Sequence, residues 1–413
     1  MPVRATKRGA ERTPLEADWD VVICGASFAG LAVARELRGS GARVLVVDRY
    51  EIGERQTSAC AAPTEWLVNL GLERSIRQTF RDLVVHAPAR TFRWTLPWTF
   101  STFDYRELCA LLGAQGDFSF ETATVSGRTG FADRNASGAA PGDVTPRNAS
   151  GATAGDVTVH TDRGDLCAPL VVDALGWRRV LGGGANVQPP EAFLSRGLEV
   201  HPDAAGRDLE LWLDPKYVRA GYAWSFPADG ELRVGVGSFD PRDHVKQPTV
   251  ELARDVDVPA VRFQGNWIPH RIRAATDGDV FFAGDSAGHC LPTTAEGIRT
   301  ALYFGLACGR ELRAVVAGER KREEALARYA SFSRSHAWKF GALLRTQDAV
   351  GRLNPTPLMT PLLRAMSSPR LIRWAFGAYL AIAPPSFALE GREPLSSPQV
   401  RPPAAALARA PTP

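Results

Sequence analysis

The residues best suited to chemistry lie in one short turn near the N-terminus. Gly25, Ser27 and Gly30 follow an apolar run and open a helical pattern, and Asp48 ends the next apolar run. Glycine lets the backbone turn sharply, a helix N-terminus offers N–H groups to a pyrophosphate, and the carboxylate can bind ribose hydroxyls. Ser27 stands where a second glycine is usual. The pattern predicts a dinucleotide site, with a buried unit lacking any ligand as the alternative.

The elements that must position this turn are visible as hydrophobic patterns. Val21 to Cys24 and Val44 to Val47 are apolar runs of strand length. Between them, Leu31, Ala34 and Leu37 recur at helical spacing. The sequence therefore predicts a βαβ unit over residues 20–48.

Later segments extend this unit into a larger fold. Buried strands ending in an acid are expected at Asp165 to Asp173 and at Asp279 to Asp285, with a helix from Gly297 to Val316. Helices are also expected over residues 65–76 and 103–115, and a strand over 118–125. Residues 190–270 contain several strand patterns separated by turn signals, which favours an antiparallel sheet.

Composition excludes several classes of protein. The 413 residues are 45% hydrophobic and 23% charged, with a formal net charge of +4, so nothing points to nucleic acid. Six cysteines lack the spacing of metal ligands, and no metal site or secreted disulfide framework is expected. The polar N-terminus lacks a signal peptide, and no stretch reaches the roughly 18 apolar residues of a membrane span. A cytoplasmic protein is expected.

Residues Phe281 to Gly305, together with the opening turn, resemble the flavin signature of the family typified by para-hydroxybenzoate hydroxylase. Asp173 to Trp177, which reads DALGW, is similar to that family's DADG motif, with Leu175 in place of the second aspartate. The resemblance implies FAD as cofactor, with Asp285 at the ribityl and pyrophosphate region. It also implies that the helix beginning near Gly297 faces the flavin pyrimidine, where its N-terminus stabilises negative charge.

A narrower resemblance rests on Gly221 to Gly237. Tyr222, Trp224, Phe226 and Pro227, followed by a Gly-x-Gly pair, are similar to the YxWxFP motif of the geranylgeranyl reductase family. That family hydrogenates isoprenoid double bonds with reduced FAD. Because side chains alternate along a strand, the three aromatic residues share one face. They are expected to line a substrate cavity with Pro292, and the alternative is that they are sheet core.

The family resemblance implies roles for further residues. Cys60 matches a cysteine near the flavin by position and is the candidate catalytic residue, with an inert loop cysteine as the alternative. Arg106 is the candidate for a helical arginine that contacts FAD, although Tyr105 fits the register better. The predicted FAD contacts are Gly25, Ser27, Phe28, Ala29, Gly30, Asp48, Arg49, Arg55, Arg106, Val125, Gly284, Asp285, Gly288, Gly297 and Ile298.

The expected fold is α/β, with a Rossmann-like, GR2-type FAD-binding domain on a parallel sheet, an inserted antiparallel substrate domain and C-terminal helices. The FAD-binding domain comprises residues 19–75, 103–180 and 271–330, and the substrate domain 76–102 and 181–270. Helices follow over 331–383, and disordered tails are expected at 1–18 and 384–413. A 13-residue tandem repeat beginning at Arg134 indicates a duplicated surface hairpin.

The leading hypothesis is an FAD-dependent oxidoreductase that reduces carbon–carbon double bonds of a geranylgeranyl or polyprenyl substrate. NADPH or a protein electron donor such as a reductase or ferredoxin would reduce FAD. A class A flavin monooxygenase acting on an aromatic or polyketide substrate is the main alternative. A lycopene cyclase-like activity and a non-catalytic FAD-dependent isoprenoid carrier are further alternatives. A halogenase is disfavoured, because it needs a catalytic lysine and none of the five lysines is suitably placed between the flavin loop and the aromatic strand.

The C-terminal region bears on location. Trp374, Phe376 and Tyr379 lie among Arg364, Arg370 and Arg373, as in a helix that rests on a membrane surface. Peripheral contact with the inner face of the membrane is therefore one expectation, and a helix that caps the core is the other.

Overall fold

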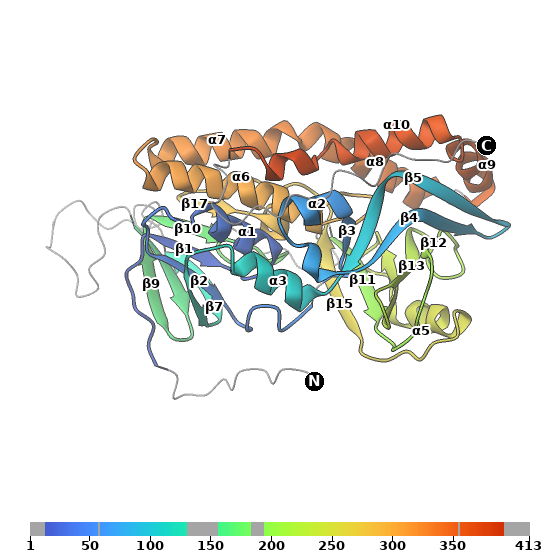
Figure 1. The fold of residues 1–413 in the computed structure, drawn as a ribbon, viewed down its shortest axis with the longest axis horizontal. Helices are drawn as coiled ribbons and strands as arrows, with labels where there is room; N and C mark the ends of the chain where they lie inside the picture. The colour runs from blue at the N-terminus through green and yellow to red at the C-terminus, as the bar shows by residue number, and fades with distance from the viewer. Residues whose placement is uncertain (1–12, 57, 130–155, 183–193, 354–355, 392–413) are drawn as a thin grey trace, which may run out of the picture.

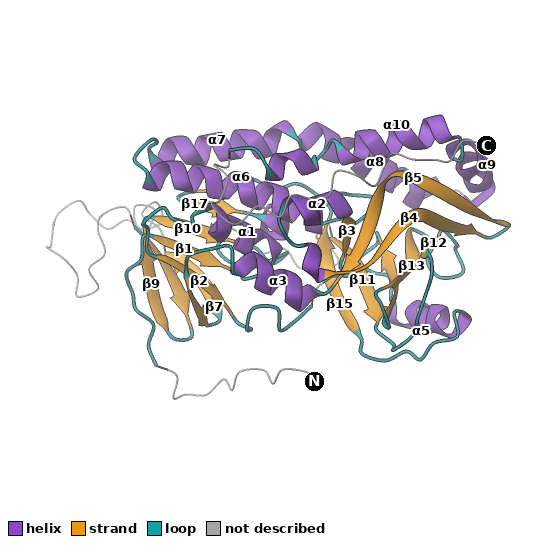
Figure 2. Cartoon of the chain, in the orientation of Figure 1, coloured by secondary structure: helices purple, strands orange, loops and turns teal. Residues whose placement is uncertain are grey.

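The computed structural model describes residues 13–56, 58–129, 156–182, 194–353 and 356–391. A parallel sheet and a large, mostly antiparallel sheet lie side by side, and a layer of C-terminal helices runs along one edge of both (Figure 1). Figure 2 shows the same arrangement by secondary structure, with the long C-terminal helices above the two groups of strands. This arrangement agrees with the predicted fold class.

The parallel sheet carries the opening βαβ unit. Its strands, in spatial order, are β16 (Thr276–Asp277), β17 (Val280–Phe282), β10 (Leu170–Asp173), β1 (Val21–Cys24), β2 (Val44–Asp48) and β6 (Ser119–Thr122). All neighbours pair in parallel except β16 and β17. Strands β1, β10 and β17 are completely buried, which explains their continuous apolar runs.

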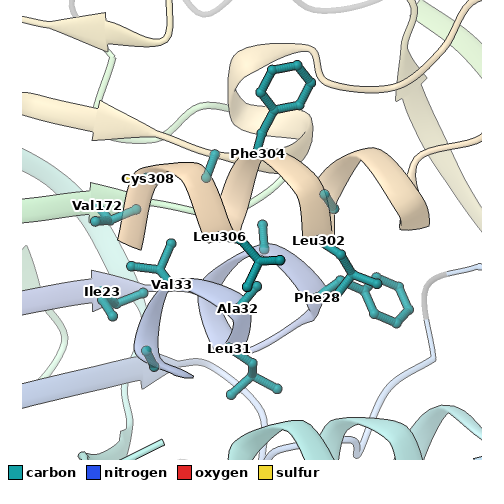
Figure 3. Packing of buried hydrophobic residues seen from close by; sticks show 14 of the residues in the cluster. Ile23, Phe28, Leu31, Ala32, Val33, Val172, Leu302, Phe304, Leu306 and Cys308 are labelled. Carbon is teal, nitrogen blue, oxygen red and sulfur yellow. The ribbon is translucent and has the colours of Figure 1, made fainter. Parts of the chain in front are cut away.

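Helix α1 (Phe28–Glu36) packs between this sheet and α6 (Ile298–Val316). Figure 3 shows Ala32, Val33, Leu302 and Leu306 filling the space between the two helices. The helices approach closely because α6 carries Gly305, where a Cβ would lie 2.7 Å from the Ala29 carbonyl oxygen. The buried apolar residues of these elements belong to one large core.

A third, smaller sheet branches from this part of the chain. It contains β7 (Val125–Thr129), β8 (Val157–Thr161) and β9 (Gly164–Ala168), all antiparallel. The expected single strand Asp165 to Asp173 is wrong, because Pro169 separates β9 from β10 and the two strands join different sheets. The strand expected over 118–125 is likewise divided between β6 and β7. Most of the tandem repeat falls in 130–155, outside the described residues.

The large sheet has eight strands in the described part of the chain. In spatial order they are β15 (Gln264–Pro269), β11 (Leu194–Val200), β14 (Leu232–Ser238), β13 (Gly221–Pro227), β12 (Leu209–Trp212), β4 (Ile76–Ala87), β5 (Arg90–Phe103) and β3 (Ala61–Pro63). Every pair is antiparallel except β4 with β12. The antiparallel prediction is thus correct for all but one pair. The division into domains remains a prediction, and β3 joins this sheet from within 19–75.

Two helices differ from the sequence-based expectation. Helix α2 (Thr64–Asn69) is shorter than predicted, because η1 (Glu73–Ser75) follows it and Ile76 already begins β4. Helix α5 (Lys246–Asp255) was not predicted; it buries Thr249, Leu252 and Ala253 beside the large sheet. Helix α3 (Tyr105–Gly113) lies where a helix was expected.

The C-terminal helices are α7 (Arg322–Ser335), α8 (Ala337–Leu353), α9 (Thr356–Met366) and α10 (Pro369–Leu380). The described chain continues past the predicted boundary of the tail as η3 (Pro385–Ala388), where the Phe387 ring lies 4.4 Å from that of Tyr303. The N-terminal boundary also shifts, because the Leu15 N–H donates to the Arg163 carbonyl at 3.0 Å. No helix in the described ranges could cross a bilayer.

The close contact of α1 and α6 generates a prediction about stability. Gly305→Ala would place a methyl group against the Ala29 carbonyl, and overpacking of this kind costs about 1–3 kcal/mol. Gly341→Ala in α8 is the matched control, since a Cβ there meets nothing within 4 Å. The control should gain about 0.5–1 kcal/mol of unfolding free energy. Urea denaturation measures both, and equal stability of the two variants would contradict the packing described.

Candidate functional site

One cavity of 1390 Å³ connects the parallel sheet with the large sheet. Its wall begins at the ends of β1, β2 and β17 and continues to the aromatic face of β13. Ligands of open α/β sheets bind at the carboxyl ends of the strands, so the location is that of a nucleotide site. The volume exceeds the range usual for a single drug-sized ligand, about 300–1,000 Å³. The cavity has room for a dinucleotide and a second molecule.

Two glycines without side chains shape the turn that follows β1. Gly25 has a φ of 112°, and a Cβ there would lie 2.3 Å from the Ala174 carbonyl oxygen. At Gly30 a Cβ would lie 1.9 Å from the Gly25 carbonyl oxygen. These two glycines are behind the wall, and they allow Ser27, Phe28 and Ala29 to line it at the N-terminus of α1. The first N–H groups of a helix have no intrahelical partner and suit a phosphate.

Asp48 lies at the end of β2 on the same wall. Its carboxylate accepts hydrogen bonds from the N–H groups of Ala26 at 2.8 Å and Tyr50 at 3.1 Å. Burial raises the pKa of Asp48, while these hydrogen bonds act in the opposite direction. Arg49 and Arg55 also line the cavity, with their guanidinium groups 4.9 and 5.3 Å from the Tyr50 ring centre. Val125 completes this side of the wall.

The second flavin segment meets the first across the cavity. Gly284 and Asp285 line it directly after β17, and Gly297 and Ile298 line it where α6 begins. A Cβ at Gly284 would lie 2.9 Å from that of Ala29, so the segment lies against the start of α1. Burial raises the pKa of Asp285 to about 6, and the nearby Arg273 acts in the opposite direction. The N-termini of α1 and α6 therefore reach one site.

Asp173 organises a part of the wall that our site prediction omitted. Its carboxylate accepts hydrogen bonds from the N–H groups of Leu175 at 2.9 Å and Leu181 at 2.7 Å, and from the Ser286 hydroxyl at 2.7 Å. These contacts shape the loop after β10, whose residues 174–178 line the cavity. The DALGW motif was the available signal, because an acid at the end of a buried strand needs donors for its carboxylate.

The aromatic residues of β13 form the far wall. Tyr222, Trp224 and Phe226 all line the cavity, as their alternation along the strand predicts. The Tyr222 hydroxyl donates to the carbonyl of Thr294, which lines the cavity just before α6. Burial raises the pKa of Tyr222, so the phenol stays protonated. The apolar lining continues with Leu83, Leu96, Trp98, Phe100, Leu209, Leu211, Leu213 and Phe376.

Besides Gly25 and Gly30, four more predicted site residues do not reach the cavity wall. Cys60 is completely buried, its thiol donates to the Ser58 carbonyl at 3.1 Å, and burial raises its pKa, so a reactive thiolate is disfavoured. Arg106 is exposed on α3, whereas Tyr105 lines the cavity and donates to the Ser27 hydroxyl at 3.1 Å. Gly288 ends η2 (Gly284–Ala287) with a φ of 65°, and Pro292 precedes the lining residues 293–298.

Helix α10 contributes to the cavity as well as to the surface. Phe376 and Tyr379 line the cavity, and the Trp98 indole N–H donates to the Phe376 carbonyl at 3.4 Å. The buried Arg299 donates to the carbonyls of Tyr379 and Leu380 at the end of the helix. Two of the three aromatic residues expected at a membrane surface therefore face inward. Trp374 remains 70% exposed.

Comparisons with known proteins agree with this geometry. No family model matches the chain. Digeranylgeranylglycerophospholipid reductase 3 of Methanosphaera stadtmanae is 24% identical over 78% of this chain and 83% of its own length. A geranylgeranyl bacteriochlorophyll reductase-like protein of Thermoplasma acidophilum has a TM-score of 0.71 at 15% identity, covering 91% of this chain and 98% of that protein. PqsL, a probable FAD-dependent monooxygenase of Pseudomonas aeruginosa, has a TM-score of 0.60 at 17% identity, covering 82% and 98%.

The structural likeness confirms the predicted fold class. The sequence likeness confirms the resemblance to the geranylgeranyl reductase family, and with it the class of FAD-dependent oxidoreductase. The roles of the individual residues stay predictions.

The phosphate turn can be tested at Ser27, which is the N-cap of α1. Ser27→Asp places a negative charge beside the expected pyrophosphate, where charges about 4 Å apart repel by about 4 kcal/mol. FAD affinity should fall at least about a hundredfold. The fold should survive, because aspartate is a good N-cap. Ser27→Gly is the matched control and should retain FAD. Flavin absorbance and fluorescence titration measure both, and full FAD retention by Ser27→Asp would contradict the assignment.

Proposed function

We propose that this protein reduces carbon–carbon double bonds of an isoprenoid lipid, with FAD as the cofactor. The observation that supports it most is the continuous cavity, which joins a nucleotide-binding turn to a long apolar and aromatic wall. A dinucleotide fits the first part because bare backbone and two helix N-termini meet there. A polyprenyl chain fits the second part because leucines from three strands extend it beyond the β13 aromatics.

The protein's own residues would bind, orient and shield. Ser27, Asp48, Asp285 and Gly297 would hold FAD, which in its reduced form supplies a hydride. The wall from Leu83 to Phe376 would exclude water and keep the alkene in one orientation. Electrons would reach FAD from NADPH or from a protein donor such as a ferredoxin.

A flavin monooxygenase is the second candidate, because PqsL shares the fold at a TM-score of 0.60. The extent of the apolar lining favours the reductase, since a compact aromatic substrate would leave the leucines of β4, β5 and β12 without contact. The two activities differ in one requirement: a hydroxylase needs oxygen, whereas saturation of an alkene proceeds without it.

The experiment is an anaerobic reaction of the dithionite-reduced holoprotein with a geranylgeranyl lipid and with a polyprenyl quinone, followed by mass spectrometry. The expected product gains two hydrogens per reduced double bond, and for the quinone this gain is counted after air has reoxidised the head group. Leu211→Lys, which puts a charge in the apolar wall, should lower product formation at least about tenfold while FAD remains bound. Leu362→Lys is the matched control at a 57% exposed leucine of α9.

Unchanged lipids in this experiment would contradict the proposed reductase. Oxygen-dependent hydroxylation of an aromatic compound by the same preparation would favour the monooxygenase instead.

We also propose that the outward face of α10 rests on an anionic membrane surface, from which a lipid substrate would be drawn. Arg370, Arg373 and Trp374 are exposed on this helix, and residues 349–389 contain no Asp or Glu. Arginines near an anionic surface contribute about 1 kcal/mol each, and tryptophan favours the interface. The inner face of the same helix lines the cavity.

Sedimentation with vesicles of phosphatidylglycerol and phosphatidylcholine tests the membrane contact. The double variant Arg370→Glu and Arg373→Glu should weaken binding at least about tenfold. Arg207→Glu with Arg254→Glu changes the charge equally at exposed sites, one just before β12 and one on α5, and should bind like the wild type. Equal binding by both double variants would contradict α10 as the contact.

A further inference from the structure

The Gly-x-Gly pair of the aromatic motif has a structural explanation in the large sheet. Trp224, Gly235 and Glu199 lie opposite one another on β13, β14 and β11. A Cβ at Gly235 would lie 2.3 Å from Cζ2 of Trp224 and 2.7 Å from Cβ of Glu199. Gly237 and Gly197 would bring a Cβ within 3.4 and 3.8 Å of the same indole. The indole therefore lies across a floor of glycines, and no other residue leaves it room at Gly235.

Beyond this floor, Glu199 holds the indole by its N–H group. Its Oε2 accepts from Trp224 Nε1 at 3.1 Å, and its Oε1 accepts from His201 Nε2 and Gln264 Nε2, each at 3.0 Å. Only 3% of Glu199 is exposed. Burial of a carboxylate is costly in free energy unless it is paired and hydrogen-bonded. The three hydrogen bonds to Glu199, one of them from a histidine, meet this need.

His201 supplies the positive charge that Glu199 needs. Its other ring nitrogen, Nδ1, lies 3.5 Å from Oε1 of Glu231. Burial alone would lower the pKa of His201, but the hydrogen bonds with Glu199 and Glu231 outweigh it and raise the pKa to about 9. The imidazolium therefore donates from both nitrogens at neutral pH. Two arginines also lie beside the imidazole. Arg233 donates to the Glu231 carboxylate, and Arg262 donates to the His201 carbonyl.

The same network holds the loop that precedes β3. Arg233, which is 3% exposed, donates to the carbonyls of Ala59 at 3.0 Å and Cys60 at 3.1 Å. Gln264 donates to the carbonyl of Ser58 at 3.3 Å. Cys60 has a φ of 52°, a conformation that non-glycine residues adopt only when their surroundings impose it. Ser58 and Ala59 line the same cavity as Trp224 and Gln264.

We propose that Glu199 and His201 are positioning residues that set the Trp224 wall and the loop at residues 58–60 together, and so determine which substrates the cavity accepts. This role rests on the proposed function for its substrate, but the placement of the indole does not. A network that only stabilises the sheet would leave Trp224 and the substrate preference unaffected when it is altered conservatively.

The first test needs no substrate. Glu199→Gln replaces one acceptor with a donor and should shift the tryptophan emission of the protein. The wild type and Glu199→Gln should no longer differ in emission when each also carries Trp224→Phe. Glu311→Gln is the matched control, a partly buried carboxylate of α6 paired with Arg320 and Arg328, and should cause no shift. A shift that persists with Trp224→Phe, or no shift at all, would overturn the proposal.

The second test follows the effect of pH, first on the wild type and then on a His201 variant. The folded-state pKa of His201 lies above its ordinary value of 6.5, so its contribution to stability is complete below pH 6.5 and is lost as the pH rises through about 9. Trp224 emission should change over the same interval. His201→Gln should remove this transition. An identical transition in His201→Gln would overturn the role of His201.

The third test separates binding from chemistry. If the proposed reductase activity holds, Glu199→Gln should raise KM for the polyprenyl substrate about tenfold and leave kcat close to the wild-type value. A fall in kcat with unchanged KM would contradict a positioning role. Failure of the reductase itself would leave the emission and pH tests intact, so the two proposals can fail separately.

Discussion

The whole structure depends on how closely α1 lies to its neighbours. Gly30 touches the backbone of Gly25, Gly284 brings the loop after β17 to Ala29, and Gly305 brings α6 onto the same helix. No larger side chain fits at these contacts without movement. Because α1 and α6 are held this way, their N-termini open into one cavity between two sheets. Dispersion and burial of apolar area stabilise the contact between α1 and its neighbours. The glycines make it possible because they have no side chains to hold the backbones apart.

In the large sheet, the main constraint acts on the orientation of the bulky aromatic residues that line the cavity. An indole could rotate in an apolar cavity, but Trp224 is confined by glycines below and by a buried carboxylate at its N–H group. Buried ion pairs often contribute little net stability, so their retention calls for another reason. Here the charges of Glu199, His201 and Arg233 fix the wall and the neighbouring loop at once. We therefore infer that the network serves to position the cavity wall more than to stabilise the sheet.

Local patterns in the sequence predict part of this arrangement well. The βαβ unit, α6 and the shared face of Tyr222 and Trp224 follow from periodicity, which depends on neighbours along the chain. The single strand predicted at Asp165 to Asp173 is wrong, because Pro169 interrupts the apolar run and separates two strands.

The remaining features come from contacts between distant residues. Glu199 meets Trp224 and Gln264 only because β11 lies between β14 and β15, and no local signal encodes that order. The backbone of Cys60 likewise meets Arg233, far along the chain, which donates to its carbonyl. The inward direction of Phe376 depends on the neighbouring β5. The resemblance to a family motif singled out Cys60 by its position in the sequence. It could not show that the Cys60 side chain lies outside the cavity wall.

The central claim is that one cavity accommodates both FAD and a polyprenyl chain, side by side. A crystal structure of the protein with FAD and a polyprenyl lipid bound tests it most directly. Density for the flavin next to residues 293–298 and for the lipid along Trp224 and Leu211 is the expected result. Lipid density at a separate surface, or a flavin that fills the apolar part of the cavity, would contradict it.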